Sequence, residues 1–341
     1  MAVTKNIINH NIRLAFFNAN GIKRQKLLFI QFLKEHNIDI ALLSETFLKP
    51  NVTFKIRNYT VIRTDRTTGK KGGTAVIIKS CLPYQPINLP QLETLEATAI
   101  KLLTTKEPIT IISVYKSPPK ELQLQDLRTL SQLNKHIIIA GDINAKNPLW
   151  NSTVPNDTGR RLEIFANQLN LQVDAPTTPT HYPIQGGRPD VLDTCIYSDV
   201  NILSGPTAID DLQSDHLPVK IEIYYRHCLP IHHPPKNAIT DWDLFRTHVA
   251  RDTKLLQPPT TILEAEENVQ QLTKIIKDEF HKHTTYLEDA NDKESKQHII
   301  STLTQLKKFI RRKWQNTRHP AFKSSYNCIS KNSIHIFSSK K

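Results

Sequence analysis

Residues 136–145 read HIIIAGDINA, and this stretch carries the strongest structural signal in the chain. Four consecutive apolar residues, three of them isoleucine, predict a buried strand over His136–Ala140. Gly141 breaks the run, and alternation places Asp142 and Asn144 on the same side, at the strand's end. A carboxylate and an amide are thus presented together where a sheet opens to solvent. Because these residue types also form ordinary turns, the motif alone leaves a turn and a reactive site open.

The composition fits a protein with a substantial hydrophobic core. The chain has 341 residues, of which 38% are hydrophobic, enough for one large domain plus an appendage. No apolar run approaches the ~20 residues that cross a bilayer, and the first residues lack the apolar core of a signal peptide. The four cysteines are scattered without a Cys-x-x-Cys pair, which indicates reduced thiols. We therefore expect an intracellular protein that is neither secreted nor bound to a membrane.

The charge is strongly basic and unevenly distributed. The chain carries 45 Lys and Arg against 32 Asp and Glu, a formal net charge of +13. Residues 301–341 contain ten Lys or Arg and no acidic residue, so this tail supplies most of the excess. A basic surplus points to a polyanionic partner, most simply nucleic acid, although a solvated tail has the same composition.

Residues 1–225 consist mainly of short apolar runs separated by turns. Helices are predicted at Gln25–His36 and Gly159–Leu169, where apolar residues recur on one face. Many strands with few helices between them indicate an α/β protein with two packed β-sheets flanked by helices, and not a parallel sheet. The predicted strands are Ile12–Phe17, Ile40–Ser44, Tyr59–Thr64, Gly73–Lys79, Ala97–Leu103, Ile109–Tyr115, His136–Ala140, Thr194–Ser198 and Pro218–Tyr224.

The character of the chain changes after residue 225. Residues 226–238 hold three prolines and several histidines and are predicted to form a linker. The histidine and cysteine spacing of this linker fits no zinc pattern. Residues 239–341 carry apolar stripes at helical spacing, which predict a basic helical C-terminal extension with one late strand at Ile334–Phe337.

Three further places put polar side chains at the ends of predicted strands. Asn18 and Asn20 repeat the alternation of the first motif, Glu45 ends an apolar strand, and Asp215 and His216 stand before the last strand. Each alone is also explained as a turn or a cap. Together, their oxygens suit Mg²⁺ and not Zn²⁺, and the imidazole can stabilise an oxyanion. A metal, a water-orienting carboxylate and a phosphate-binding histidine are the minimum for phosphodiester hydrolysis.

Other hydrolase signatures are missing from the sequence. The chain has no Gly-x-x-x-x-Gly-Lys-Ser/Thr loop, which argues against a P-loop nucleotidase, and no Gly-x-Ser-x-Gly, which argues against a serine hydrolase. The motifs instead resemble, in their order, those of the endonuclease/exonuclease/phosphatase superfamily. These motifs are Asn18-Ala-Asn20-Gly, Ser-Glu45-Thr, Ser-Val-Tyr115, Gly-Asp142-Ile-Asn144-Ala and Ser-Asp215-His216.

More narrowly, the chain resembles the apurinic-type endonuclease of non-LTR retrotransposons of the jockey-like group. The resemblance covers nearly all of residues 10–225. Residues 310–320 are similar to the segment that links endonuclease to reverse transcriptase in such elements. The chain has no room for a polymerase palm after that segment. We therefore expect a product truncated before the reverse transcriptase.

The resemblance implies a four-layered α/β sandwich that nicks DNA with a divalent metal, Mg²⁺ or alternatively Mn²⁺, and without a small-molecule cofactor. It makes Glu45 the metal ligand, with Asn18 close to the metal and the phosphate. It also implies that Asp142 positions or deprotonates the attacking water, and that Asn144 and His216 bind the scissile phosphate.

The remaining implied roles belong to four residues around this centre. Asp215 orients His216 or assists the metal, and Tyr115 contacts the phosphate or helps the leaving oxygen. Asp193 supports His216 from behind. Asn20 departs from the repair enzymes, which typically have Asp there. One carboxylate fewer is expected to weaken metal binding somewhat, and it argues against a housekeeping repair role.

Five residues outside these motifs are candidates for nucleic-acid contact. Lys71 lies in a basic stretch that suits contact with DNA phosphates, and an ordinary basic hairpin turn explains the same stretch equally well. Trp150 suits stacking on DNA, with packing in the protein as the alternative. Arg311, Arg312 and Lys313 suit contact with single-stranded nucleic acid, including the RNA of the element. A nuclear localisation signal explains these three equally well.

The prediction from sequence is a Mg²⁺-dependent DNA endonuclease of a non-LTR retrotransposon, acting in the nucleus and present also in the cytoplasm. In an intact element, the 3′-hydroxyl that it leaves would prime reverse transcription at the target. Two alternatives stay open. One is a phosphatase or deadenylase of the same superfamily, and the other is an inactive remnant that binds nucleic acid.

Overall fold

The computed structural model describes residues 8–67, 69, 71–105, 107–183, 187–227, 238–253, 257–286, 306–307, 309–315 and 317–338. The chain divides into two compact units, residues 1–231 with 303–341 and residues 232–302. The basic end of the chain thus groups with the first unit, whereas the sequence predicted one extension over residues 239–341. Most of the predicted linker lies outside the described residues.

Two six-stranded sheets form the first unit, with the orders β11-β12-β1-β2-β4-β3 and β5-β6-β7-β8-β10-β9. Each sheet contains one central parallel pair, β1 with β2 and β7 with β8, between antiparallel neighbours. The first sheet consists of β1 (Ile8–Asn18), β2 (Ile40–Ser44), β3 (Tyr59–Thr64), β4 (Thr74–Lys79), β11 (Ile202–Ala208) and β12 (Val219–His227). The second consists of β5 (Tyr84–Ile87), β6 (Leu95–Leu102), β7 (Ile109–Lys116), β8 (Ile137–Asp142), β9 (Gln172–Asp174) and β10 (Asp193–Ser198).

The main core lies between the two sheets. Its side chains come from both inner faces, and they include Leu14, Val76, Ile111 and Ile138. Further apolar clusters cover the outer faces, so central strands such as β2 and β8 are buried throughout. This double burial explains why these strands are continuous apolar runs in the sequence and do not alternate.

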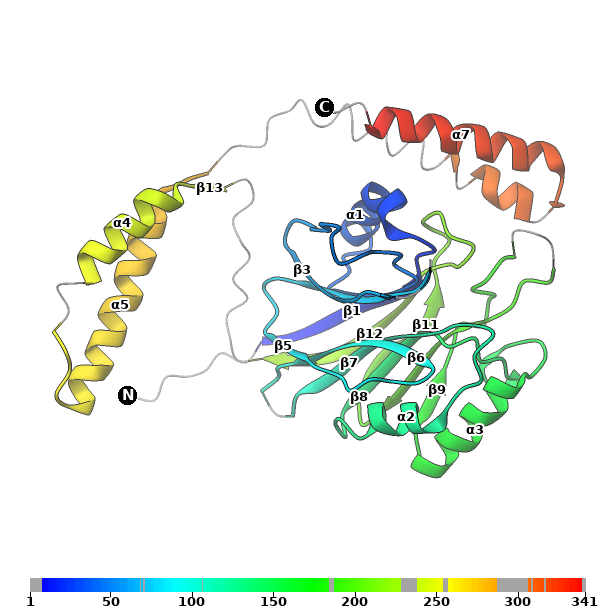
Figure 1. Cartoon of the computed structure of the whole chain (residues 1–341), viewed down its shortest axis with the longest axis horizontal. Helices are drawn as coiled ribbons and strands as arrows, with labels where there is room; N and C mark the ends of the chain where they lie inside the picture. Colours follow the sequence, from blue (N-terminus) through cyan, green and yellow to red (C-terminus); the bar gives the residue numbers. More distant parts are fainter. Residues whose placement is uncertain are drawn as a thin grey trace. The chain divides into compact units, whose positions relative to one another are not determined.

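Helices complete the four layers (Figure 1). On the first sheet, η1 (Ile22–Gln25) leads into α1 (Lys26–Glu35), which packs through Phe29 and Phe32. On the second sheet lie α2 (Leu124–Ser131) and α3 (Asp157–Leu169). The α3 helix is capped by Asn156, whose side-chain oxygen accepts from Gly159 N at 2.8 Å. The predicted four-layered sandwich is confirmed.

The rest of the described chain is mostly helical, as predicted. The second unit contains α4 (Trp242–Thr253), α5 (Ile262–Lys282) and a ribbon of β13 (Ala238–Thr240) with β14 (Thr284–Tyr286). The end of the chain contains helical residues 309–315 and α7 (Pro320–Ser338). The predicted strand at Ile334–Phe337 is wrong, because α7 continues through it. None of the described helices is both long and apolar enough to cross a bilayer.

Candidate active site

The two parallel strand pairs bring the predicted motifs to one edge of the sandwich. In the first sheet, Asn18 at the end of β1 is the register partner of Ser44, which precedes Glu45. In the second sheet, Asp142 at the end of β8 pairs with Tyr115 on one side and with Asp193 on the other. Because parallel strands end on the same side, residues far apart in the sequence meet there.

Asn18 lies between the two central carboxylates. Its side-chain Nδ2 donates to Asp142 Oδ2 at 2.7 Å and lies 3.3 Å from Glu45 Oε1. Its Oδ1 accepts from the backbone N–H of Asn20 at 3.1 Å. In this orientation Asn18 presents an N–H, and not its side-chain oxygen, to the space between the two carboxylates. The hydroxyl of Tyr115 donates to the same Glu45 oxygen at 2.7 Å.

His216 stands between two carboxylates. Its Nδ1 lies 2.8 Å from Asp193 Oδ2, and its Nε2 faces Asp142 Oδ2 at 3.7 Å. Both carboxylates and the imidazole are buried. Asp193, predicted only as support, is therefore the residue that orients the His216 ring.

Burial and these partners shift the pKa values of the pair. Burial is the largest effect on Asp142 and raises its pKa to about 7, although the charge of His216 opposes the shift. Burial would lower the pKa of His216, but Asp193 and Asp142 outweigh it and raise the pKa to about 10. At neutral pH the imidazole is therefore a cation, and Asp142 is poised to exchange a proton.

Asp215 joins a separate set of contacts beside His216. Its Oδ1 accepts from Asn20 Nδ2 at 3.0 Å, and its Oδ2 lies 3.6 Å from His181 Nε2. Burial would raise the pKa of Asp215, but the contact with His181 and the charge of His216 outweigh it and hold the pKa below its usual range. Asp215 therefore stays ionised and contacts His181 and Asn20. Of its two predicted roles, orienting His216 or assisting the metal, the first belongs to Asp193 in this geometry.

Asn144 shapes the turn after β8. Its backbone N–H donates to Asp142 Oδ1 at 3.0 Å, and its Nδ2 donates to the carbonyl of Lys116 at 2.9 Å. It adopts a positive φ of 53°, which Asn tolerates better than most residues. Asn144 thus fixes the Asp142 carboxylate, and its amide nitrogen is directed to the end of β7.

Comparisons with known proteins agree with this arrangement. The endonuclease/exonuclease/phosphatase family model described as "Endonuclease-reverse transcriptase" matches residues 109–220. The probable RNA-directed DNA polymerase from transposon X-element of Drosophila melanogaster is 26% identical over 329 residues, 93% of this chain and 36% of the relative. The chain is thus similar to proteins of the endonuclease/exonuclease/phosphatase superfamily.

Other similar proteins also come from mobile elements. The RNA-directed DNA polymerase from mobile element jockey of Drosophila melanogaster is 28% identical over 270 residues, 74% of this chain and 28% of the relative. The endonuclease domain of TRAS1, a telomere-specific non-LTR retrotransposon, shares the fold with a TM-score of 0.53 and 20% identity, covering 63% of this chain and 98% of that one. The chain spans about a third of the length of the curated relatives.

Two residues beside the candidate site were not predicted from the sequence as site residues. His181 packs against His216 in a tilted arrangement, with ring centroids 4.5 Å apart, and forms a β-bridge with it. Ser214 holds the chain ahead of Asp215, because its Oγ donates to the carbonyl of Asn18 at 2.8 Å. The local signal for His181 was a histidine in a loop next to an aromatic residue, which is too common to single out a site.

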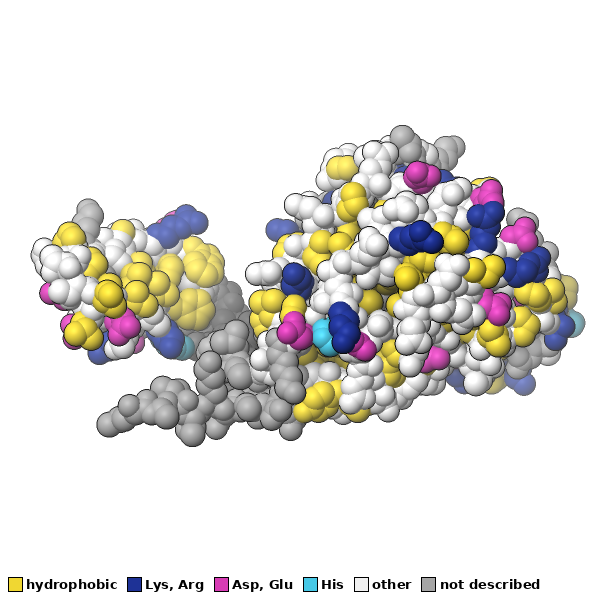
Figure 2. Space-filling view, turned by 90° about the horizontal axis from the view of Figure 1, so that it is seen from below, with side chains coloured by type: hydrophobic (Ala, Val, Ile, Leu, Met, Phe, Trp, Pro, Cys, Tyr) yellow, Lys and Arg dark blue, Asp and Glu magenta, His cyan; other side chains and the backbone are white. Residues whose placement is uncertain are grey.

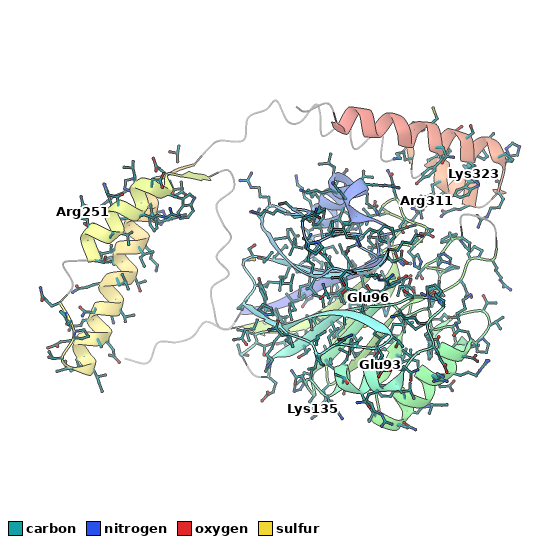
Figure 3. The ribbon with its side chains drawn as sticks, viewed as in Figure 1. Glu93, Glu96, Lys135, Arg251, Arg311 and Lys323 are labelled. Carbon is teal, nitrogen blue, oxygen red and sulfur yellow. The ribbon has the colours of Figure 1, made fainter. Side chains whose placement is uncertain are left out.

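The predicted nucleic-acid contacts need correction at two positions. Trp150, in η2 (Pro148–Trp150), is 3% exposed and its Nε1 donates to the carbonyl of Ala145 at 3.0 Å, so it packs in the core and does not face DNA. Arg311, labelled in Figure 3, is also buried, and its guanidinium donates to the backbone carbonyls of Leu212 and Ser214. It therefore has a structural role.

The other three predicted contacts are exposed. Lys71 lies beside the Glu45 loop with its Nζ 5.9 Å from the ring centre of Phe47. Arg312 pairs with Asp210, and Lys313 is exposed on the same turn. On the face of the first unit seen in Figure 2, basic and acidic side chains are mixed. This face therefore has no continuous positive patch on which a polyanion such as DNA would bind.

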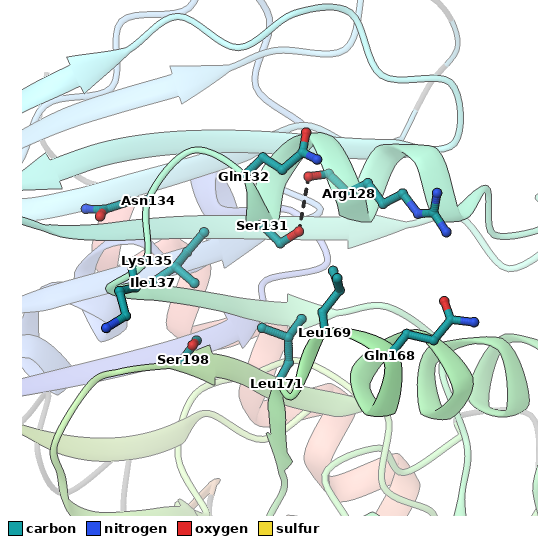
Figure 4. A pocket seen from close by; sticks show the side chains of 10 residues that line it. All are labelled: Arg128, Ser131, Gln132, Asn134, Lys135, Ile137, Gln168, Leu169, Leu171 and Ser198. Carbon is teal, nitrogen blue, oxygen red and sulfur yellow. Dashed lines mark hydrogen bonds between the residues drawn. The ribbon is translucent and has the colours of Figure 1, made fainter.

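A separate hollow lies at the opposite end of β8 from Asp142. It has a volume of about 520 Å³ and lies between α2 and α3, beside Ile137 and Ser198 (Figure 4). Its charged lining residues are Arg128 and Lys135, without a carboxylate or imidazole. The hollow therefore lacks a carboxylate or imidazole for acid–base chemistry, and the site around Asp142 and His216 remains the candidate centre.

Proposed function

We propose that the chain is a metal-dependent endonuclease that nicks DNA at the target site of a non-LTR retrotransposon. The observation that carries the proposal is the buried pair of Asp142 and His216 beside Glu45. In this pair Asp142 can accept a proton, and the facing His216 is a cation. A phosphodiester needs both groups, because attack by water requires a base and adds charge to the phosphate oxygens.

The oxygens at this edge fit a hard divalent cation. Glu45 and Asp142 both approach the Asn18 amide, which stands between their carboxylates as a hydrogen-bond donor. Mg²⁺ needs only one or two carboxylates and keeps several waters, so Glu45 would hold it with Asp142 close by. When bound, Mg²⁺ would supply positive charge to the phosphate oxygens.

The protein's own groups divide the work of hydrolysis. Asp142 accepts a proton from the attacking water and is held in place by Asn18 and the backbone of Asn144. His216, kept protonated by Asp193, donates to a phosphate oxygen through Nε2. In-line attack breaks the bond between phosphorus and the 3′ oxygen, which takes a proton from solvent, so the nick carries a 3′-hydroxyl and a 5′-phosphate.

DNA is the proposed substrate because of the relatives and the charge. The similar solved domain belongs to a telomere-specific retrotransposon, and the chain carries a formal net charge of +13. Lys71, Arg312 and Lys313 are the exposed groups that we propose for backbone contact, with the basic end of the chain also able to meet the RNA of the element. This substrate would place the protein in the nucleus.

Supercoiled plasmid tests the proposal directly. With Mg²⁺, the full chain should convert supercoiled DNA to the open circle, and EDTA should stop the reaction. Asp142→Asn should lower the nicking rate by roughly 10²–10⁴-fold, since it removes the base. Asp157→Asn is the matched control, because Asp157 is exposed at the start of α3.

The products separate this function from its competitors. A DNA polymerase should extend the nick without prior treatment if a 3′-hydroxyl is present. Shortening of poly(A) or release of inorganic phosphate, without nicking, would assign the site to a deadenylase or a phosphatase. DNA binding without cleavage in the wild type would identify an inactive remnant.

A further inference from the structure

Two imidazoles and a carboxylate converge in the second unit, outside the active site. His248 Nδ1 and His283 Nε2 each lie 3.2 Å from Glu279 Oε2. The two nitrogens lie 3.1 Å from each other. The three atoms therefore form a nearly equilateral triangle, contributed by α4, by α5 and by the residue that ends α5.

Protons alone do not satisfy this triangle. If both nitrogens carry hydrogen, two donors face each other across 3.1 Å. If either nitrogen lacks hydrogen, its lone pair faces the ionised carboxylate of Glu279. A cation above the triangle would instead accept a lone pair from all three atoms at once.

Burial points to the same place. Among the described residues of this unit, the buried side chains are Glu279 and Thr284, while α4 has none. A carboxylate is among the side chains least often buried without partners. The pair of helices α4 and α5 therefore has little apolar core, and one of its two buried side chains, Glu279, is of a type that commonly binds metal ions.

The backbone of the hairpin holds the three residues in position. His283 follows Glu279 by one helical turn, and its carbonyl accepts from the N–H of Asp241 at 2.9 Å, just before α4. The ribbon of β13 and β14 ties the same ends together. An aromatic cluster of Trp242, Phe245 and Phe280 packs alongside, with ring centroids 5.6 to 6.4 Å apart.

We propose that His248, Glu279 and His283 bind Zn²⁺ and staple α4 to α5. Two imidazoles and a carboxylate form a ligand set that zinc takes, with water completing a tetrahedron. Zinc ligands at about 2.0–2.1 Å from the ion lie about 3.3 Å from one another, close to the observed spacing. Lys282 pairs with the other oxygen of Glu279, which leaves Oε2 free to bind in monodentate fashion. Small units with little core commonly depend on such a metal.

Zinc titration of the full chain tests the site. The protein, freed of metal, is titrated with Zn²⁺ against a chromophoric chelator in excess Mg²⁺, which occupies hard-oxygen sites. Wild type should bind zinc in one tight step that His283→Ala and Glu279→Gln each weaken by at least about 100-fold. Co²⁺ in place of zinc should give the intense visible absorption of a tetrahedral site in wild type only.

The matched control is His281→Ala, since His281 is exposed on the same turn of α5 but is not part of the triangle. It should bind zinc like wild type. Glu279→Gln keeps the size of the side chain, and circular dichroism verifies that each variant is folded. Wild-type protein that binds no zinc, or equal zinc affinity in wild type and His283→Ala, overturns the proposal. Nicking activity plays no part in this test.

Discussion

Arg311, in the basic end of the chain, donates a hydrogen bond to the main-chain carbonyl of Ser214, which directly precedes Asp215 and His216. The other arm of its guanidinium donates to the carbonyl of Leu212 at 2.7 Å. Leu212 has a positive φ of 61°, an unfavourable conformation for a branched side chain. A residue almost one hundred positions away thus holds the loop that carries the imidazole.

Replacing Arg311 should loosen this loop. Arg311→Ala removes two charge-assisted donors from buried carbonyls, a loss of about 2 kcal/mol in local stability. Amide hydrogen exchange at residues 212–216 should then accelerate by roughly thirty-fold. Lys313→Ala, on the exposed side of the same turn, should leave that exchange unchanged. Equal protection from amide exchange in Arg311→Ala and wild type would show that the loop is stable without Arg311.

The sequence was sufficient for the elements that local patterns determine. Apolar runs located β2, β7 and β8, the polar residues at the ends of two of them identified Glu45 and Asp142, and the family resemblance added Tyr115. Neighbouring strand ends then brought these residues together. The sequence was insufficient where a side chain's environment depends on distant segments. Nothing local distinguishes a buried Arg311 from the exposed Lys313, because both lie in one basic run.

The pH profile of nicking should have two limbs. Asp142 must lose its proton to act as a base, so the rate should rise as the pH increases through about 7. His216 must keep its proton, so the rate should fall as the pH increases through about 10. A divalent cation at Glu45 would move the lower limb to more acidic pH, because it stabilises the carboxylate. Initial rates at constant ionic strength check both limbs, and a flat profile would contradict the assigned pair.

Asp193→Asn should lower the pKa of His216. The Asp193 carboxylate is the main group that outweighs the effect of burial, so its loss favours the neutral imidazole. The upper limb of the rate profile should therefore move to lower pH, and the ring signals of His216 in NMR should titrate there too. Asp174→Asn is a suitable control, because Asp174 bonds Tyr197 on an outer strand. An unchanged titration of His216 would rule out control by Asp193.

Tyr115→Phe should weaken binding of the metal more than it weakens folding. The Tyr115 hydroxyl donates to Glu45 Oε1 at 2.7 Å and so fixes the proposed ligand. Loss of such a supporting bond costs about 10–100-fold in metal affinity. The Mg²⁺ concentration that gives half of the maximal rate should rise accordingly. Tyr197→Phe removes a similar bond to Asp174 away from the site, and it should leave the Mg²⁺ requirement unchanged.

Gly141→Ala should destabilise the protein and displace Asp142. A Cβ on Gly141 would lie 2.1 Å from the carbonyl oxygen of Val114, within the parallel pairing of β7 and β8. That contact is backbone, so the strands must separate, at about 2–3 kcal/mol. The midpoint of thermal unfolding should fall by roughly 5–10 °C, and the nicking rate should fall further than the loss of folded protein explains. Gly205→Ala is the matched control, because a Cβ there meets nothing within 4 Å. Equal unfolding midpoints for the two variants would show that β7 can move away from the added Cβ without loss of stability.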